Sequence, residues 1–156
     1  MSPFTPPPDR ASSATSLPPP HVVLRHAPPI VFMDRIVHVT KAETVTEWRV
    51  PHECPWVADG KLAESSLIEI AAQTAAAGIG VLAVRAGEPI PPGALGSIRN
   101  FVVHEEVRVG DLLRTTVTRR FDIAGASLVG CVVERISDDV TTIATGELGL
   151  VPTALL

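Results

Sequence analysis

Cysteine is scarce in this sequence, since there are only two, Cys54 and Cys131, and they form no CxxC pair. A disulfide framework is therefore not expected, and we predict reduced thiols in a cytoplasmic protein. Basic residues are also few: 13 Lys and Arg stand against 17 Asp and Glu, giving a net charge of -4. These basic residues are scattered along the chain, whereas a nucleic-acid-binding protein gathers them on one face, so we expect no nucleic-acid partner.

Several signatures of catalytic and cofactor sites are missing too. The sequence has no P-loop and no G-x-S-x-G motif, and its five histidines are too widely spaced for an HxxxH metal pair. We therefore predict neither a metal nor an organic cofactor. The first residues also lack a basic patch followed by an apolar run, so no signal peptide is expected.

Proline is unevenly distributed and marks the start of the folded region. Seven of the 15 prolines fall within residues 1–20, among Ser, Thr and Ala. Such a segment favours extended conformations and cannot form a core, so we predict a disordered tail over residues 1–20. The remaining residues 21–156 are long enough for one domain with a substantial core.

The longest apolar stretch, residues 67–86, is rich in Ala and Gly but also contains Glu69 and Arg85. Alanine and glycine gain little from lipid, so we expect burial inside the protein and no membrane span. A helix is predicted over residues 65–85, closed by Gly87 and followed by Pro89. It is narrow and almost wholly apolar, which indicates that other parts of the chain wrap around it.

Segments rich in Val, Ile, Leu and Thr predict the wrapping structure. Two precede the helix, at residues 30–39 and 44–50, and four follow it, at residues 96–104, 112–123, 127–136 and 140–151. The breaks between the last three segments are short, and short connections join antiparallel neighbours. The expected architecture is α+β, with an antiparallel sheet curved around one long helix.

Glu69 needs an explanation, because a carboxylate inside an apolar helix costs free energy if it is buried and unpaired. Ser66-x-x-Glu69 matches a capping box, in which the glutamate returns to the amide at the helix start. Alternatively, burial could raise the pKa of the carboxyl and make it a general acid. Gln73 lies one turn further on the same face and can orient that carboxyl in either case.

The histidines are candidates for a partner base. His52 lies in the loop before the helix and is our preferred candidate for that position. His26 and His104 are alternatives, and any single histidine is more often structural. Cys54 as a nucleophile is conceivable, although a lone loop cysteine rarely has that role.

These residues together resemble the 3-hydroxyacyl-carrier-protein dehydratases of the hotdog fold, and most of all their aryl-polyene-type branch. The resemblance covers about residues 22–152. The matching segments are Leu24-x-His26-x-x-Pro29-Ile30, Met33-Asp34-Arg35-Ile36, Asp59-Gly60-x-Leu62, Glu69-Ile70-Ala71-Ala72-Gln73, Ala86-Gly87-Glu88-Pro89 and Leu95-Gly96 through Arg99.

The resemblance implies a hotdog fold in which two protomers pair edge to edge, as a homodimer or as a hetero-oligomer with a related subunit. It implies an acyl chain on an acyl carrier protein, which loses water to give a trans-2-enoyl thioester. Glu69 takes the position of the family's acid and Gln73 that of the amide after it. Ser65 and Ser66, at the helix start, take substrate-binding positions.

The family's histidine position falls on Pro55 in this chain, so His52 is expected to substitute for it as the catalytic base. Two other functions fit the same resemblance. One is an acyl thioesterase, with Glu69 or Asp59 activating water. The other is a non-catalytic acyl-binding or partner subunit whose active relative supplies the histidine.

Overall fold

The computed structural model describes residues 16–153. Its elements in chain order are α1 (Pro20–Val23), β1 (Arg35–Val39), β2 (Glu43–Arg49), β3 (Val57–Ala58), β4 (Lys61–Leu62), α2 (Ser65–Ala86), β5 (Gly93–Val103), β6 (Leu112–Ile123), β7 (Ala126–Ile136) and β8 (Val140–Pro152). Residues 1–15 of the predicted tail lie outside the described part. Leu17 already packs against an apolar cluster, so ordered packing begins before residue 21.

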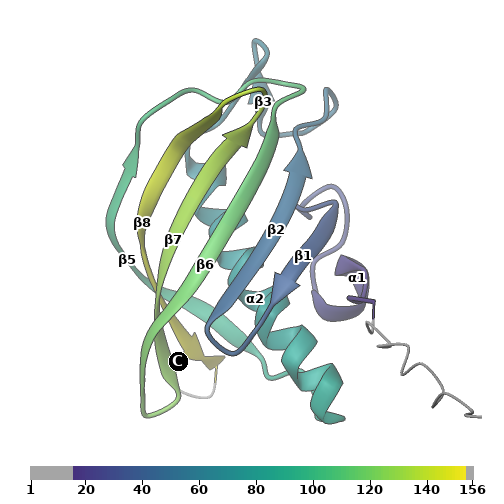
Figure 1. The fold of residues 1–156 in the computed structure, drawn as a ribbon, viewed down its shortest axis with the longest axis vertical. Helices are drawn as coiled ribbons and strands as arrows, with labels where there is room; N and C mark the ends of the chain where they lie inside the picture. Colours follow the sequence, from purple (N-terminus) through teal and green to yellow (C-terminus); the bar gives the residue numbers. More distant parts are fainter. Residues whose placement is uncertain (1–15, 154–156) are drawn as a thin grey trace, which may run out of the picture.

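Six strands form one antiparallel sheet in the order β1-β2-β6-β7-β8-β5. The long strands β6, β7 and β8 follow one another as hairpins, as their short connections predict (Figure 1). The shorter β1 and β2 extend one side of the sheet, and β5 forms the opposite edge. The expected α+β architecture is confirmed.

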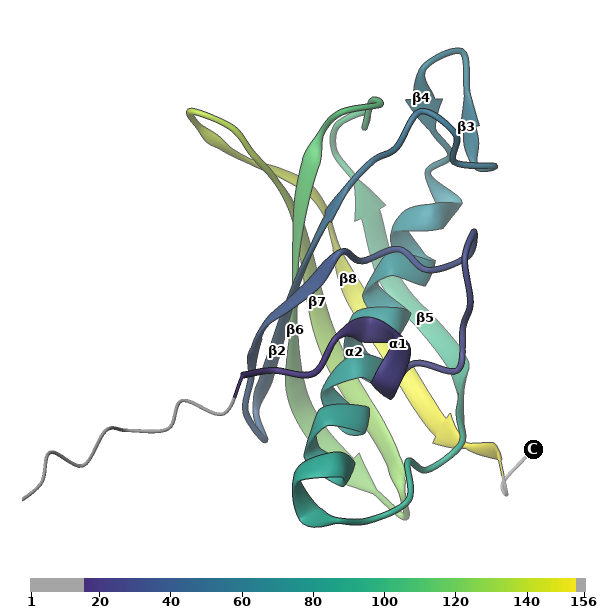
Figure 2. The same cartoon turned by 90° about the vertical axis from the view of Figure 1, so that its right-hand side faces the viewer.

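Helix α2 lies along the concave face of this sheet (Figure 2). Its small residues let the sheet approach closely: a Cβ added to Gly78 would stand 2.0 Å from the Thr44 hydroxyl oxygen on β2. One turn earlier, the Thr74 and Thr46 hydroxyls are 2.7 Å apart. By length and composition α2 could cross a membrane, but 61% of its most apolar window is buried within the protein, as expected of a core helix.

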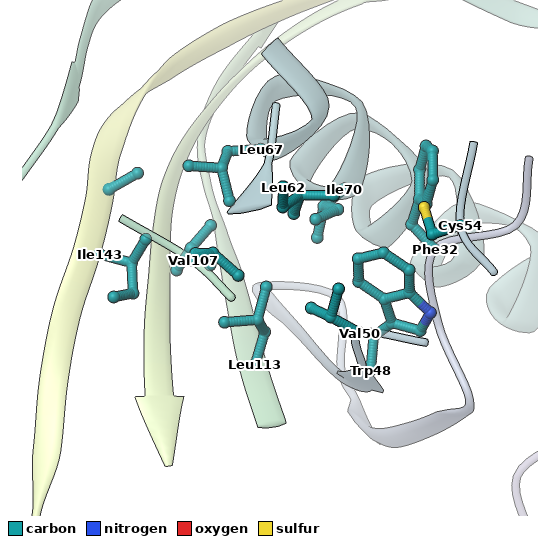
Figure 3. Packing of buried hydrophobic residues seen from close by; sticks show 12 residues of the cluster. Phe32, Trp48, Val50, Cys54, Leu62, Leu67, Ile70, Val107, Leu113 and Ile143 are labelled. Atoms are coloured by element: carbon teal, nitrogen blue, oxygen red, sulfur yellow. The ribbon is translucent and has the colours of Figure 1, made fainter. Parts of the chain in front are cut away.

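The largest apolar cluster joins the first turns of α2 to the sheet (Figure 3). Its buried members are Phe32, Trp48, Val50, Cys54, Leu62, Leu67, Ile70, Val107, Leu113, Val133, Ile143 and Ala144. Phe32 packs edge-on against both Trp48 and Trp56, with ring centroids 5.1 Å apart in each pair. This packing fixes the chain before β1 against β2 and against the loop that leads to β3.

A buried carboxylate lies on the opposite face of the sheet. Glu47 of β2 accepts hydrogen bonds from Arg35 of β1 and Arg114 of β6, and its side chain is only 4% exposed. Burial alone would raise the pKa of Glu47, but the hydrogen bonds and charges of the two guanidinium groups outweigh it and hold that pKa below its ordinary value. The Met33-Asp34-Arg35 segment therefore contributes Arg35 to the sheet and not to a catalytic site.

Four features differ from the sequence-based expectations. The short helix α1 and the β3–β4 hairpin were not expected, and β5 begins at Gly93 instead of residue 96. The predicted capping box of Ser66 and Glu69 is not formed. Glu64 occupies the cap position of α2 without a side-chain hydrogen bond, and the buried Ser66 hydroxyl has no partner among the described residues.

Candidate active site

Gln73 joins α2 to the chain segment before β1. Its Oε1 accepts a hydrogen bond from the Phe32 amide at 2.9 Å, and its Nε2 donates to the Ile30 carbonyl at 2.7 Å. The same Nε2 donates to Glu69 Oε1 at 2.9 Å. Because Phe32 supplies a donor and Ile30 an acceptor, the amide of Gln73 has one favourable orientation, and that orientation directs an N–H at Glu69.

The docked segment places His26 beside Glu69. The His26 Nε2 lies 3.6 Å from Glu69 Oε1, and the two side chains are 38% and 43% exposed. The other ring nitrogen, Nδ1, is buried and has no hydrogen-bond partner among residues 16–153. The imidazole therefore presents Nε2 to the carboxylate and to the open space beside it.

That space is a cleft of about 350 Å³. The α2 side chains that line it are Glu69, Ala72, Ala76 and Ile79, which follow one face of the helix at spacings of three and four residues. Other parts of the chain supply the walls, listed here in order: Val23, Leu24, Arg25, His26, Ile90, Pro91, Pro92, Gly93, Ala94, Leu95, Leu150 and Thr153. The cleft is mainly apolar, and its lining includes the titratable side chains Glu69 and His26 in contact with each other.

A carboxyl and an imidazole in contact can move a proton onto one atom of a ligand and off another. Such pairs carry out general acid–base reactions when a substrate lies within hydrogen-bonding reach of both. The apolar walls beyond the pair suit a hydrocarbon group, because burying such surface is favourable. The arrangement therefore suits acid–base chemistry at the polar end of an otherwise apolar molecule.

The structure corrects the expected environment of Glu69. The carboxylate is not fully buried, and it contacts Gln73 and His26 instead of the helix start. Gln73, in contrast, is where the sequence analysis placed it, one turn along and bonded to Glu69.

Other predicted site residues lie elsewhere. His52 is exposed in the turn between β2 and β3, and within the described part of the chain no hydrogen bond or ion pair joins it to Glu69. Ser65 is exposed and Ser66 is buried at the start of α2, and neither lines the cleft. Of His26 and His52, the structure places His26 beside Glu69.

The remaining candidates do not form a second catalytic group. Asp59 lies in the β3–β4 turn with a φ of 52°, away from the cleft lining. His104 Nε2 lies 3.2 Å from the Thr145 hydroxyl, and Cys54 is buried in the core cluster. Among residues 16–153, no group of three or more His, Cys, Asp or Glu side chains is arranged to bind a metal.

Comparison with solved structures shows the hotdog fold. A chain of the dehydratase heterocomplex ApeI:P from Xenorhabdus doucetiae matches with a TM-score of 0.79 at 18% identity, over 86% of this chain and 90% of that one. The PaaI protein from the phenylacetic acid degradation operon of E. coli matches with a TM-score of 0.59 at 11% identity, over 76% and 78%. An acyl-CoA hydrolase from Staphylococcus aureus matches with a TM-score of 0.56 at 12% identity, over 76% and 71%.

Similarity at the level of sequence points to one family. No curated protein sequence gives a significant match. The sequence model of the ApeP-like family, described as ApeP dehydratase, matches residues 18–154, which is most of the chain and includes His26, Glu69 and Gln73. The chain therefore belongs to the ApeP-like dehydratase family.

Proposed function

We propose that this protein removes water from 3-hydroxyacyl thioesters carried on an acyl carrier protein, with His26 and Glu69 as the reacting pair. The observation that carries the proposal is the 3.6 Å contact between these two side chains at the polar end of an apolar cleft. Family membership supports the type of reaction. The position of His26 replaces our earlier preference for His52 as the base.

The reaction needs one base and one acid. His26 Nε2 takes a proton from the carbon next to the thioester carbonyl, and the electron pair left behind forms the new C=C bond. The C–O bond at the next carbon breaks, and Glu69 donates its proton to the departing hydroxyl, which leaves as water. The products are a 2-enoyl thioester and water, together with imidazolium and carboxylate.

Loss of the proton from His26 to water and protonation of Glu69 from water restore the starting state, because both side chains are partly exposed. Gln73 holds Glu69 Oε1 by a hydrogen bond, so Oε2 is the oxygen available to carry the proton toward substrate. The acid and the leaving hydroxyl then meet on the side of Glu69 that faces away from Gln73.

We propose that a second hotdog subunit, identical or related, pairs with the β5 edge. This 11-residue edge strand is exposed along nearly its whole length, and its apolar side chains Leu95, Ile98 and Val102 are 38%, 47% and 49% exposed. An open edge with apolar side chains favours strand pairing. The start of β5 also lines the cleft, so such a partner would cover the cleft from that side.

A mass-spectrometric assay tests the reaction. The protein is incubated with a 3-hydroxyacyl carrier-protein thioester, and the expected product has lost one water. His26→Ala and Glu69→Gln should each lower turnover by about 10²–10⁴-fold, the usual contribution of an acid or base. His52→Ala is the matched control, because His52 is exposed and outside the cleft, and it should retain the wild-type rate.

The same assay separates the rival functions. Release of free carrier thiol without loss of water would indicate a thioesterase, a function for which the cleft offers Glu69 but not Asp59. No reaction by the chain alone, with activity restored by a related hotdog subunit, would indicate a partner subunit. Light scattering tests the pairing: a stable monomer at micromolar concentration would contradict the proposed β5 interface.

A further inference from the structure

The exposed part of α2 is a narrow strip. Along its middle turns the partly exposed side chains are Ile68, Glu69, Ala72, Ala76 and Ile79, and the positions between them are buried. Four of these five line the cleft. Within the cleft the strip starts at the Glu69 carboxylate. It continues over the methyl groups of Ala72 and Ala76 and ends at the larger side chain of Ile79.

The far end of the strip lies beside α1, whose Val23 lines the cleft. A Cβ on Gly80 would stand 2.7 Å from the carbonyl oxygen and 2.7 Å from the Cβ of Val23, so α1 packs directly on the α2 backbone there. Figure 2 shows α1 lying across α2, and the chain after α2 leading round to β5. Ile79 and α1 thus limit how far a ligand that starts at Glu69 can extend.

The length of the strip can be estimated from helix geometry. Glu69 and Ile79 are ten residues apart, which is about 15 Å at 1.5 Å per residue. A fully extended chain advances about 1.2 Å per bond, so roughly a dozen bonds span the strip. The cleft volume of about 350 Å³ agrees, since it holds on the order of ten groups of about 30 Å³ each.

We infer that this cleft measures acyl-chain length, and that Ala72 and Ala76 are its specificity-determining residues. The inferred substrate class is acyl chains that extend at most about a dozen bonds past the hydroxyl-bearing carbon. Ala72 stands about 4.5 Å and Ala76 about 10.5 Å along the helix from Glu69. A larger side chain at either position blocks the cleft at that distance. This inference rests on the proposed function, because the reacting carbon is placed at Glu69.

The test is a ladder of 3-hydroxyacyl thioesters with four, eight, twelve and sixteen carbons, assayed with wild type, Ala72→Leu and Ala76→Leu. Each methylene buried in an apolar site strengthens binding about fourfold. Ala76→Leu should therefore lower kcat/KM for the twelve-carbon substrate at least tenfold, with the four-carbon rate kept within about twofold. Ala72→Leu should lower kcat/KM at least tenfold already for the eight-carbon substrate. Val84→Leu is the control, because Val84 is exposed on α2 outside the cleft, and its ladder should match wild type.

A second ladder separates this inference from the proposed reaction. Unreactive thioether analogues of the same chain lengths are bound to Glu69→Gln, alone and combined with each leucine variant, and their affinities are measured by calorimetry. Affinities that fall from eight carbons onward in the Ala72→Leu background and from twelve carbons onward in the Ala76→Leu background support the limit on chain length, even if no substrate is dehydrated. Affinities independent of chain length, or equal losses at all lengths in both leucine variants, would overturn it even if dehydration is confirmed.

Discussion

Replacing Gln73 tests whether the link between α2 and the N-terminal segment also holds the acid. Gln73→Leu keeps the side-chain volume but removes all three hydrogen bonds of a residue that is 1% exposed. The Phe32 amide is then left buried without an acceptor, which costs about 1–3 kcal/mol. Ile30 is exposed, so its carbonyl can turn to water at a smaller cost. Together, the losses at the Phe32 amide and the Ile30 carbonyl should lower the free energy of unfolding by about 2–4 kcal/mol.

Urea unfolding followed by tryptophan fluorescence measures this loss, and a thermal scan should show a midpoint lowered by roughly 5–15 °C. Turnover should fall as well, because Glu69 loses the N–H that orients it. A Gln73→Leu protein within about 0.5 kcal/mol of wild type and with full turnover would refute the reasoning.

Gln73→Glu is the sharper comparison, because it keeps the shape and one acceptor for Phe32. The introduced carboxylate would face the Ile30 carbonyl and Glu69, so its folded-state pKa should lie above its unfolded value of about 4.3. A raised folded-state pKa means that stability is retained below about pH 4.3 and lost as pH rises through the raised value. The stability gap to wild type should therefore widen between pH 4 and pH 8, and a gap that narrows would contradict the arrangement.

Three further predictions concern positions away from the reacting pair. Gly80→Ala should destabilise by about 1–3 kcal/mol in urea unfolding despite the better helix propensity of alanine, because its methyl would overlap Val23 of α1; a stabilised variant would show that α1 is not docked there. Because the pKa of Glu47 is lowered in the folded protein, its ion pairs stabilise the fold above about pH 4.3, and this stabilisation is lost as the pH falls through the folded-state pKa. Glu47→Gln should therefore make the free energy of unfolding depend less on pH in the acidic range. Burial raises the pKa of Cys131 to about 11, so a maleimide should label this thiol slowly at pH 8 and rapidly in urea; fast labelling of the folded protein would exclude its burial.

The fold was predictable because its signals are local. The Ala- and Gly-rich residues 65–85 indicated a narrow core helix, and α2 is observed at Ser65–Ala86. The short breaks around Gly125 and at residues 137–139 indicated antiparallel neighbours, which are β6, β7 and β8. The short break around Gly110 misleads, because β5 before it pairs with β8 and not with β6. The β3–β4 hairpin was missed because two-residue strands are too short for any alternation, although Asp59-Gly60 is a typical turn pair.

The site was only half predictable. Glu69 and Gln73 are four residues apart on one helix, so their pairing follows from helix geometry. His26 lies 43 residues from Glu69, and only the docking of residues 30–32 on Gln73 brings it there. No local sequence pattern predicts that His26 contacts Glu69. His52 was preferred because it is closer to the helix in the sequence.

The docking of residues 30–32 on Gln73 also has a dynamic consequence. The segment before β1 supplies both His26 and the Val23–Leu24 wall, whereas β6, β7 and β8 are held together by their own continuous ladders. Segments held by few bonds open more readily than sheet cores, and a ligand that binds only the closed form raises the free energy of that opening. A ligand in the cleft should thus slow the hydrogen exchange of the Phe32 amide, although Phe32 does not line the cleft, while the central strands exchange at an unchanged rate.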